Sequence, residues 1–228
     1  GGSIAIPDGV TSIASGVFAN NTSLTAIDLN GVTSLGTGVF QGCSQLQSAS
    51  LGSVTSIPSN TFRECSALSS VSIPGTCTSI GDSAFYGCVS LSSISIPSSV
   101  TSISLPSAFT GASNLTSINI ASGNSNYSSS NGCVYNATGT RLIYVPEGKT
   151  SVSFPSSCTT IGQNAFSSSS VSEITIPASI TSIESQSGWS PTIYGYAGSA
   201  AETYAKDHAL TFIVIGNDNT NDTDDSDS

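Results

Sequence analysis

The chain has 228 residues, of which 37% are apolar and 8% charged, and its 14 Asp and Glu against four Lys and Arg give a formal net charge of −10. Four cations cannot form the basic patch that neutralises phosphates, which excludes nucleic acid and anionic membrane surfaces as partners. The sequence contains no run of about 18 apolar residues, which excludes a membrane-spanning helix.

The N-terminal residues "GGSIAIPDGV" are typical of the end of one repeat and the start of the next. No signal peptide is visible, and we expect the chain to be a fragment of a longer protein. The first coil then lacks a cap, so its strand edge could pair weakly with a second copy of the chain.

A unit of about 22 residues recurs along the chain. Aligned on phenylalanine, it recurs in steps of 22, 22, 23, 24 and then 57 residues at Phe18, Phe40, Phe62, Phe85, Phe109 and Phe166. Each phenylalanine follows a V/C/I-T-S/T-I/L unit and precedes a block such as "LSSISI" at 91–96. A period of about 20–29 residues with this L-x-x-L-x-L pattern indicates a leucine-rich solenoid.

The second block alternates like a strand, with Ile94 and Ile96 inward and Ser93 and Ser95 outward, and a proline follows it. The middle segment "SAFYGC" predicts one helical or 3₁₀ turn. Burial within one coil cannot offset the conformational entropy of ordering it, so the coils must stack on one another.

The spacing breaks between residues 121 and 157, where we expect a hairpin insert at about 121–150. "CVY" and "RLIYVP" would form its strands around a turn at 136–140, and "SVSF" (151–154) would restore the repeat strand. Near the end, Ser199 and Glu202 have capping-box spacing. They predict a helix to about His208, followed by a last strand "LTFIVI", as a cap at about 189–215.

Residues 216–228 form an acidic segment that we expect to be a disordered tail, since five Asp lie in the last eleven residues. It lacks the Gly and Glu that an EF-hand calcium loop requires.

The pattern I/V-T-S-I-G-x-x-A-F-x-G-C-x-S-L-x-x-I-x-I-P resembles the BspA-like leucine-rich repeats of bacterial surface proteins. Residues 79–97 follow it almost letter for letter, "TIYGYAGSAAETYAKDHALTFIVI" (192–215) is similar to the closing segment of such proteins, and the resemblance covers about residues 4–215. It implies an exported, non-enzymatic protein with a role in adhesion and in host or matrix binding.

The predicted fold is a β-rich (α+β) solenoid, a curved right-handed stack of about seven to eight coils of 22–24 residues with short helical turns. One leucine-rich-repeat domain would span residues 1–215, including the insert and the helix–strand cap.

The six cysteines read as buried free thiols that act as small apolar side chains, with a disulfide framework as the alternative. There is no Cys/His cluster for a metal and no sign of a cofactor. His208 suits the C-terminus of the predicted helix. No G-x-S-x-G elbow occurs and the acids are scattered, so no catalytic residue is predicted.

Two groups of residues are candidates for ligand binding. Insertions in solenoids project from one face, so the insert tyrosines Tyr127, Tyr135 and Tyr144 could form an exposed aromatic platform; alternatively they form the insert's own core. Tyr194 and Tyr196 in the cap leave the same two possibilities. The second group is the outward strand column Asp28, Ser50, Ser72, Ser95, Asn119, Ser153 and Thr175.

The sequence therefore favours a non-enzymatic protein-binding module of an exported bacterial cell-surface protein, acting in adhesion with a host or matrix protein as partner. The expected location is extracellular or the cell surface. The alternative function is a structural spacer in a larger surface protein, without a ligand of its own.

Overall fold

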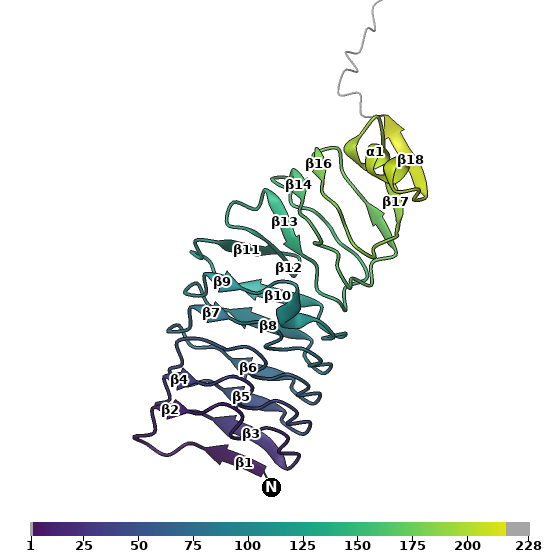
Figure 1. The fold of residues 1–228 in the computed structure, drawn as a ribbon. Helices are drawn as coiled ribbons and strands as arrows, with labels where there is room; N and C mark the ends of the chain where they lie inside the picture. The colour runs from purple at the N-terminus through teal and green to yellow at the C-terminus, as the bar shows by residue number, and fades with distance from the viewer. Residues whose placement is uncertain (1, 218–228) are drawn as a thin grey trace, which may run out of the picture.

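The computed structural model describes residues 2–217 as an elongated stack of coils that ends in a helix and a strand (Figure 1). This β-solenoid confirms the predicted fold class. The coils after the insert are tilted against those before it in Figure 1. No helix within the described range is long and apolar enough to cross a membrane.

The longer strands of successive coils form parallel ladders on one face. β1 (Gly2–Ala5), β3 (Leu24–Asp28), β5 (Ser48–Ser50) and β6 (Ser70–Ser72) pair in that order, β8 (Ser93–Ile96) pairs with β10 (Ser117–Ile120), and β15 (Glu173–Thr175) pairs with β17 (Thr192–Ala197) and then β18 (Phe212–Asn217). Their register joins equivalent repeat positions, so the inward residue of each strand lies beside the inward residue of the next.

Short strands form a second set of parallel ladders. β2 (Ser12–Ile13) pairs with β4 (Ser34–Leu35), β7 (Ser79–Ile80) with β9 (Ser102–Ile103), and β14 (Thr160–Ile161) with β16 (Ser182–Ile183). The repeated threonine strengthens this contact, since the Thr33 hydroxyl donates to the Thr11 carbonyl at 3.2 Å and Thr55 repeats the contact on Thr33 at 3.3 Å.

The predicted helical turn is wrong for most coils. Within residues 2–217 there is one 3₁₀ turn, η1 (Ser107–Phe109). The equivalent segments of the other coils form tight turns instead. One such turn is closed by the Cys88 N–H, which donates to the Phe85 carbonyl at 3.2 Å. The segment is too short for a second helical turn, because it must reach the next strand within the same coil.

A column of stacked phenylalanine rings runs through the core. The centroids of successive rings from Phe18 to Phe109 lie 5.4–5.5 Å apart and their planes differ by 16° or less. This separation is slightly above the strand spacing, because each coil adds one ring on top of the last. The four rings from Phe40 to Phe109 have no exposed surface.

The insert has one strand more than predicted. β12 (Cys133–Asn136) and β13 (Arg141–Tyr144) form the expected antiparallel hairpin, but β11 (Tyr127–Ser130) also pairs antiparallel with β12. Asn131 and Gly132 join β11 to β12. Their φ angles of +49° and +79° lie in the left-handed region, which asparagine and glycine adopt readily in tight hairpin turns. β13 then pairs in parallel with β14, which returns the chain to the repeat.

The predicted strand at 151–154 is not assigned, although Val152 and Phe154 still pack against the core. At the C-terminal end, α1 (Ala200–Asp207) begins at the N-cap Ser199, whose hydroxyl accepts from the Glu202 N–H at 3.4 Å. β18 runs to Asn217, two residues past the predicted end. The tail that we predict to be disordered comprises residues 216–228, and from residue 218 on it lies outside the described range.

Candidate functional site

The longer strands expose one face of the stack, which we call the outer strand face. It consists of two columns of side chains that point away from the core, one formed by Ala26, Ser48, Ser70, Ser93, Ser117 and Glu173, the other by Asp28, Ser50, Ser72, Ser95, Asn119 and Thr175. Ser151 and Ser153, which the sequence places in these columns, are exposed but lie in a segment that pairs with no strand, and the Ser153 hydroxyl accepts a hydrogen bond from the Asn131 amide at 2.7 Å. The residue between the two columns is buried in most coils, as Ile94 is between Ser93 and Ser95, whereas Val71 is half-buried.

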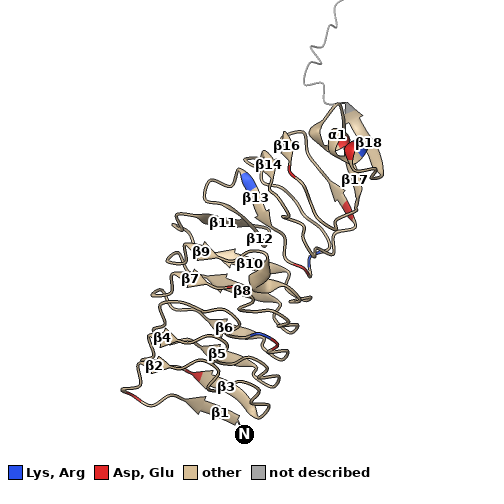
Figure 2. Cartoon of the chain, viewed as in Figure 1, with Lys and Arg blue, Asp and Glu red and all other residues tan. Residues whose placement is uncertain are grey.

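The structure places the predicted column residues together on this face. Ser72, Ser95, Asn119 and Thr175 are exposed, and Asp28 and Ser50 are half-buried. Most of these groups are short hydroxyls, so the face offers hydrogen bonds and little charge. Figure 2 shows the same sparseness over the whole solenoid, where charged residues are few and scattered.

One depression on the outer strand face lies beside Ser95 and Asn119. It has a volume of about 300 Å³, and its floor is largely apolar, formed by residues such as Ile73, Ile96 and Ile120. Its size and mixed lining fit one or two side chains of a partner protein, and it is too open to enclose a small molecule.

A second depression of about 260 Å³ lies near the C-terminal end of the same face. It is lined by Ser151, Val152, Glu173, Ile174, Thr175 and Tyr194. The strand register puts Tyr194 beside Thr175 and Ile213 beside Tyr194, so the second column becomes aromatic and apolar at this end. The sequence leaves open whether Tyr194 belongs to the core or to an exposed aromatic platform, and the strand register places it, half-buried, on this face.

The insert tyrosines do not form an exposed platform, which corrects that expectation. Tyr135 and Tyr144 have 0% and 1% of their surface exposed, and both rings lie in the core. Tyr127 is half-buried, and its hydroxyl accepts a hydrogen bond from the Ile103 N–H at 3.3 Å. The physical reason is that the insert replaces part of a coil, so its large side chains must fill the space that a repeat would have filled.

Tyr135 is unusual because its hydroxyl is buried without a hydrogen-bond partner among the described residues. Burial, with smaller contributions from Cys133 and Cys158, raises the pKa of this phenol above its usual range. A neutral phenol with no partner is a poor candidate for ligand recognition.

Two asparagines join the insert to the coil before it. The Asn124 amide donates to the Val100 carbonyl at 2.6 Å, and the Asn126 amide donates to the Thr101 carbonyl at 2.8 Å. In regular coils, a carbonyl at this position accepts a hydrogen bond from a backbone N–H of the next coil. The Thr78 carbonyl, for example, accepts one from the Thr101 N–H at 3.0 Å. The sequence does not predict this role of either asparagine, because the side-chain amide takes the place of a backbone N–H of the regular repeat.

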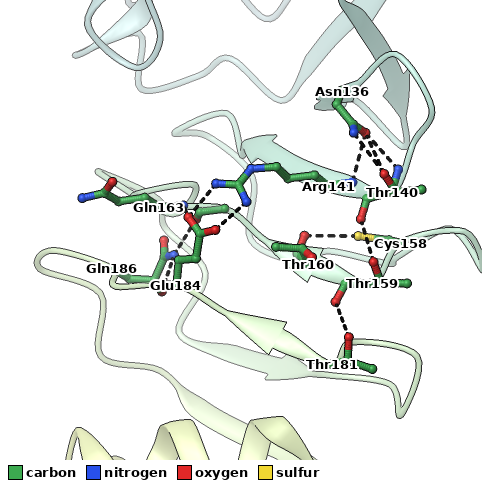
Figure 3. Close-up of polar contacts among 11 residues, drawn as sticks. Asn136, Thr140, Arg141, Cys158, Thr159, Thr160, Gln163, Thr181, Glu184 and Gln186 are labelled. Atoms are coloured by element: carbon green, nitrogen blue, oxygen red, sulfur yellow. Dashed lines mark hydrogen bonds and ion pairs between the residues drawn. The ribbon is translucent and has the colours of Figure 1, made fainter.

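Polar contacts also join the insert to the coils that follow (Figure 3). The Arg141 guanidinium binds both carboxylate oxygens of Glu184. The Gln163 N–H also donates to Glu184, at 2.9 Å. The hydrogen bonds from Arg141, with a smaller contribution from the Gln163 N–H, lower the pKa of the Glu184 carboxyl. This pair spans two coils and reinforces the stack at the site where the repeat resumes.

All six cysteines are free and fully buried. In the central column, the Cys65 thiol donates to the Phe40 carbonyl at 3.1 Å and the Cys88 thiol to the Phe62 carbonyl at 3.2 Å. Burial raises the pKa of the Cys88 thiol to about 12. These groups are therefore packing residues in a state that resists thiolate chemistry.

His208 is the C-cap residue of α1, as predicted. One ring nitrogen lies 2.9 Å from the Tyr204 carbonyl, and the two rings stack at 4.1 Å. A third depression of about 480 Å³ lies between α1 and β16 and includes His208 and Asp207. Within residues 2–217, no three His, Cys, Asp or Glu side chains come together in a group that could hold a metal ion.

The sequence matches the BspA type leucine rich repeat region in six copies, over residues 2–116, 50–151 and 108–187. No curated protein sequence matches the chain.

Among solved structures, a leucine rich cell surface protein from Faecalibacterium prausnitzii is 26% identical with a TM-score of 0.57, over 79% of this chain and 56% of that one. A leucine-rich repeat protein from Bacteroides ovatus is 24% identical with a TM-score of 0.58, over 94% of this chain and 59% of that one. The chain thus spans less than two thirds of either protein. The second likeness concerns the fold alone.

Proposed function

Because the chain belongs to the BspA-type leucine-rich repeat family, we propose that it is a non-enzymatic protein-binding module of an exported bacterial cell-surface protein, with a role in adhesion. Its partner is a host or matrix protein, and its location is extracellular or on the cell surface. The likeness to a bacterial leucine rich cell surface protein supports this location.

The outer strand face is the observation that carries the proposal. It presents exposed Ser72, Ser95 and Asn119 on the coils before the insert and exposed Thr175 on the coils after it, with one shallow depression beside Ser95 and Asn119 and another beside Thr175. A rigid face of this kind suits an extended protein surface, because solenoids offer long binding surfaces rather than enclosed pockets. Few charges have to be desolvated on binding, so apolar side chains of a partner can enter the depressions at little cost.

The burial of Tyr135 and Tyr144 favours the second candidate, a structural spacer without its own ligand. The spacer needs only a continuous core, and these rings help to provide it. The two candidates differ in whether substitutions on the outer strand face change any binding.

The test is binding of the purified chain to a panel of extracellular-matrix and host cell-surface proteins, measured by surface plasmon resonance. Ser95→Arg and Thr175→Arg place a long cation in each depression and should weaken binding at least tenfold. Ser102→Arg is the matched control, since Ser102 is exposed on the short-strand ladder. If a panel protein binds and all three variants bind it equally, the outer strand face is not the site. If no panel protein binds, the spacer is favoured.

A further inference from the structure

Within residues 2–217, the strand β18 is the last of its ladder, and one of its two edges has no partner strand in that range. Its other edge pairs with β17 in the sheet order β15-β17-β18. Ile193 of β17 donates its N–H to the Thr211 carbonyl at 2.9 Å. Because backbone groups alternate in direction along a strand, the N–H and C=O of Phe212 and Val214 point away from β17, toward the free edge.

This edge also carries an apolar surface. Ile213, Val214 and Ile215 are 40%, 53% and 46% exposed, and they are three of the six large apolar residues that are exposed within residues 2–217. Ile213 lies beside Tyr194, which connects this apolar surface to the end of the outer strand face. Three successive exposed apolar residues beside free backbone groups form a template for another strand.

Of the features that keep a free strand edge from pairing with another chain, β18 has one, a β-bulge. Its register shifts between the pairs Gly195–Val214 and Tyr196–Gly216, which leaves Ile215 as an extra residue. Such a bulge ends regular pairing locally, so an added strand would pair with the segment before it, at Phe212–Val214. β18 contains neither proline nor a charged residue, which are the other common protections.

The charge around this edge selects the partner. Glu202 and Asp207 lie on α1, which packs against β18, together with one cation, Lys206. Five Asp follow the strand in the sequence, and the whole chain has a net charge of −10. Pairing with a second copy would bring like charges together, whereas a cationic segment would be attracted.

We propose that the free edge of β18 binds an extended, cationic polypeptide segment by strand addition, with backbone hydrogen bonds to Phe212 and Val214 and apolar side chains against Ile213. The surface is distinct from the two depressions of the outer strand face, so the Ser95 and Thr175 variants do not test it. Its failure would leave the proposed function untouched.

The probe is a fluorescent synthetic peptide of alternating Val and Lys, about eight residues long to match a strand. A peptide of alternating Val and Glu tests the charge. A peptide with the same Lys content and proline in place of alternate Val tests the backbone pairing, because proline removes the N–H donor. Binding to the full chain is followed by fluorescence anisotropy.

Two variants test the site. Val214→Pro removes the Val214 N–H, which points away from β17. Proline is tolerated at such a position of an edge strand, so the pairing of β18 with β17 should remain. Ile213→Lys adds a cation and removes the apolar contact. Val89→Lys is the matched control, because Val89 is 39% exposed in another coil. Circular dichroism checks that each variant is folded.

The proposal expects binding of the Val/Lys peptide, at least tenfold weaker binding to both β18 variants, and unchanged binding to Val89→Lys. It also expects slower hydrogen exchange at the Val214 amide when the peptide is bound. Equal binding of the proline peptide would overturn the proposal, because attraction by net charge alone would explain it. No binding, equal binding by Ile213→Lys, or a chain dimer that excludes the peptide would also overturn it.

Discussion

The ring of Tyr144 stacks on the ring of Phe109, with centroids 6.4 Å apart and planes 23° from parallel. Tyr144 therefore extends the phenylalanine column into the insert. The column then stops, and Phe166 stacks on Trp189 at 4.0 Å in a separate cluster of buried residues. The insert thus completes the core of the N-terminal coils and begins that of the C-terminal coils.

Tyr144→Ala should lower the free energy of unfolding by about 3–5 kcal/mol, the usual cost of deleting a buried aromatic ring. Tyr144→Phe keeps the stack and should change it by less than about 1 kcal/mol. Urea denaturation measures both. Equal losses for the two variants would show that the hydroxyl, and not the ring, is the stabilising group.

Tyr135→Phe should leave stability unchanged or raise it by about 1–3 kcal/mol, because it removes a buried hydroxyl that has no partner among the described residues. Tyr135→Ala should be strongly destabilising, since it leaves a cavity. Thermal unfolding compares the two. A clear loss of stability in Tyr135→Phe would mean that the hydroxyl has a hydrogen-bond partner, such as a buried water.

Asn124→Ala should lower the free energy of unfolding by about 2–4 kcal/mol, because it leaves several backbone groups unpaired. The side chain donates to the Val100 carbonyl and accepts from the N–H groups of Asn126 and Tyr127, both at 2.9 Å. Ser122→Ala, at an exposed neighbouring position, is the control. A similar effect of both substitutions in urea denaturation would contradict this role.

The Arg141–Glu184 pair should add a small, pH-dependent stability. The folded state lowers the pKa of Glu184, so its contribution is complete above the ordinary glutamate pKa and is lost as pH falls through the folded value. Both side chains are more than a third exposed, so the contribution should stay below about 1 kcal/mol. Glu184→Gln should be less stable than the parent chain at pH 7, and the difference should shrink as pH falls below the ordinary glutamate pKa. A difference that does not change with pH would point to packing instead.

The six buried thiols should react with a thiol-specific reagent at pH 8 only as fast as the chain unfolds. Burial raises the pKa of Cys133 to about 11 and that of Cys88 to about 12, which leaves almost no thiolate. All six should react in denaturant without a reductant. Fewer than six would indicate a disulfide in the purified protein.

Much of this fold follows from local sequence. The phenylalanine, the "TSI" unit and the alternating block each recur at a fixed distance, and each occupies the same place in every regular coil. The cap helix begins at Ser199 because its capping signal is local. The third strand of the insert was also within reach, since Asn131-Gly132 is a strong hairpin signal.

Other features could not be read from the sequence. Asn124 and Asn126 act on carbonyls about 24 residues away, and nothing in their own segment indicates that those carbonyls lack a partner. The aromatic end of the outer strand face depends on the register of β15, β17 and β18. In the chain, β15 and β17 are separated by a segment that contains β16, and β17 and β18 by the cap helix.

The sequence by itself determined the repeat, the inward and outward sides of each strand and the closing helix, because stacked coils bury the same positions every time. Only the tertiary structure decided that Tyr135 and Tyr144 belong to the core and that β18, the last strand within residues 2–217, has exposed apolar side chains. The reason is that burial outside the repeat depends on which segments lie next to one another, and no periodic pattern encodes that neighbourhood.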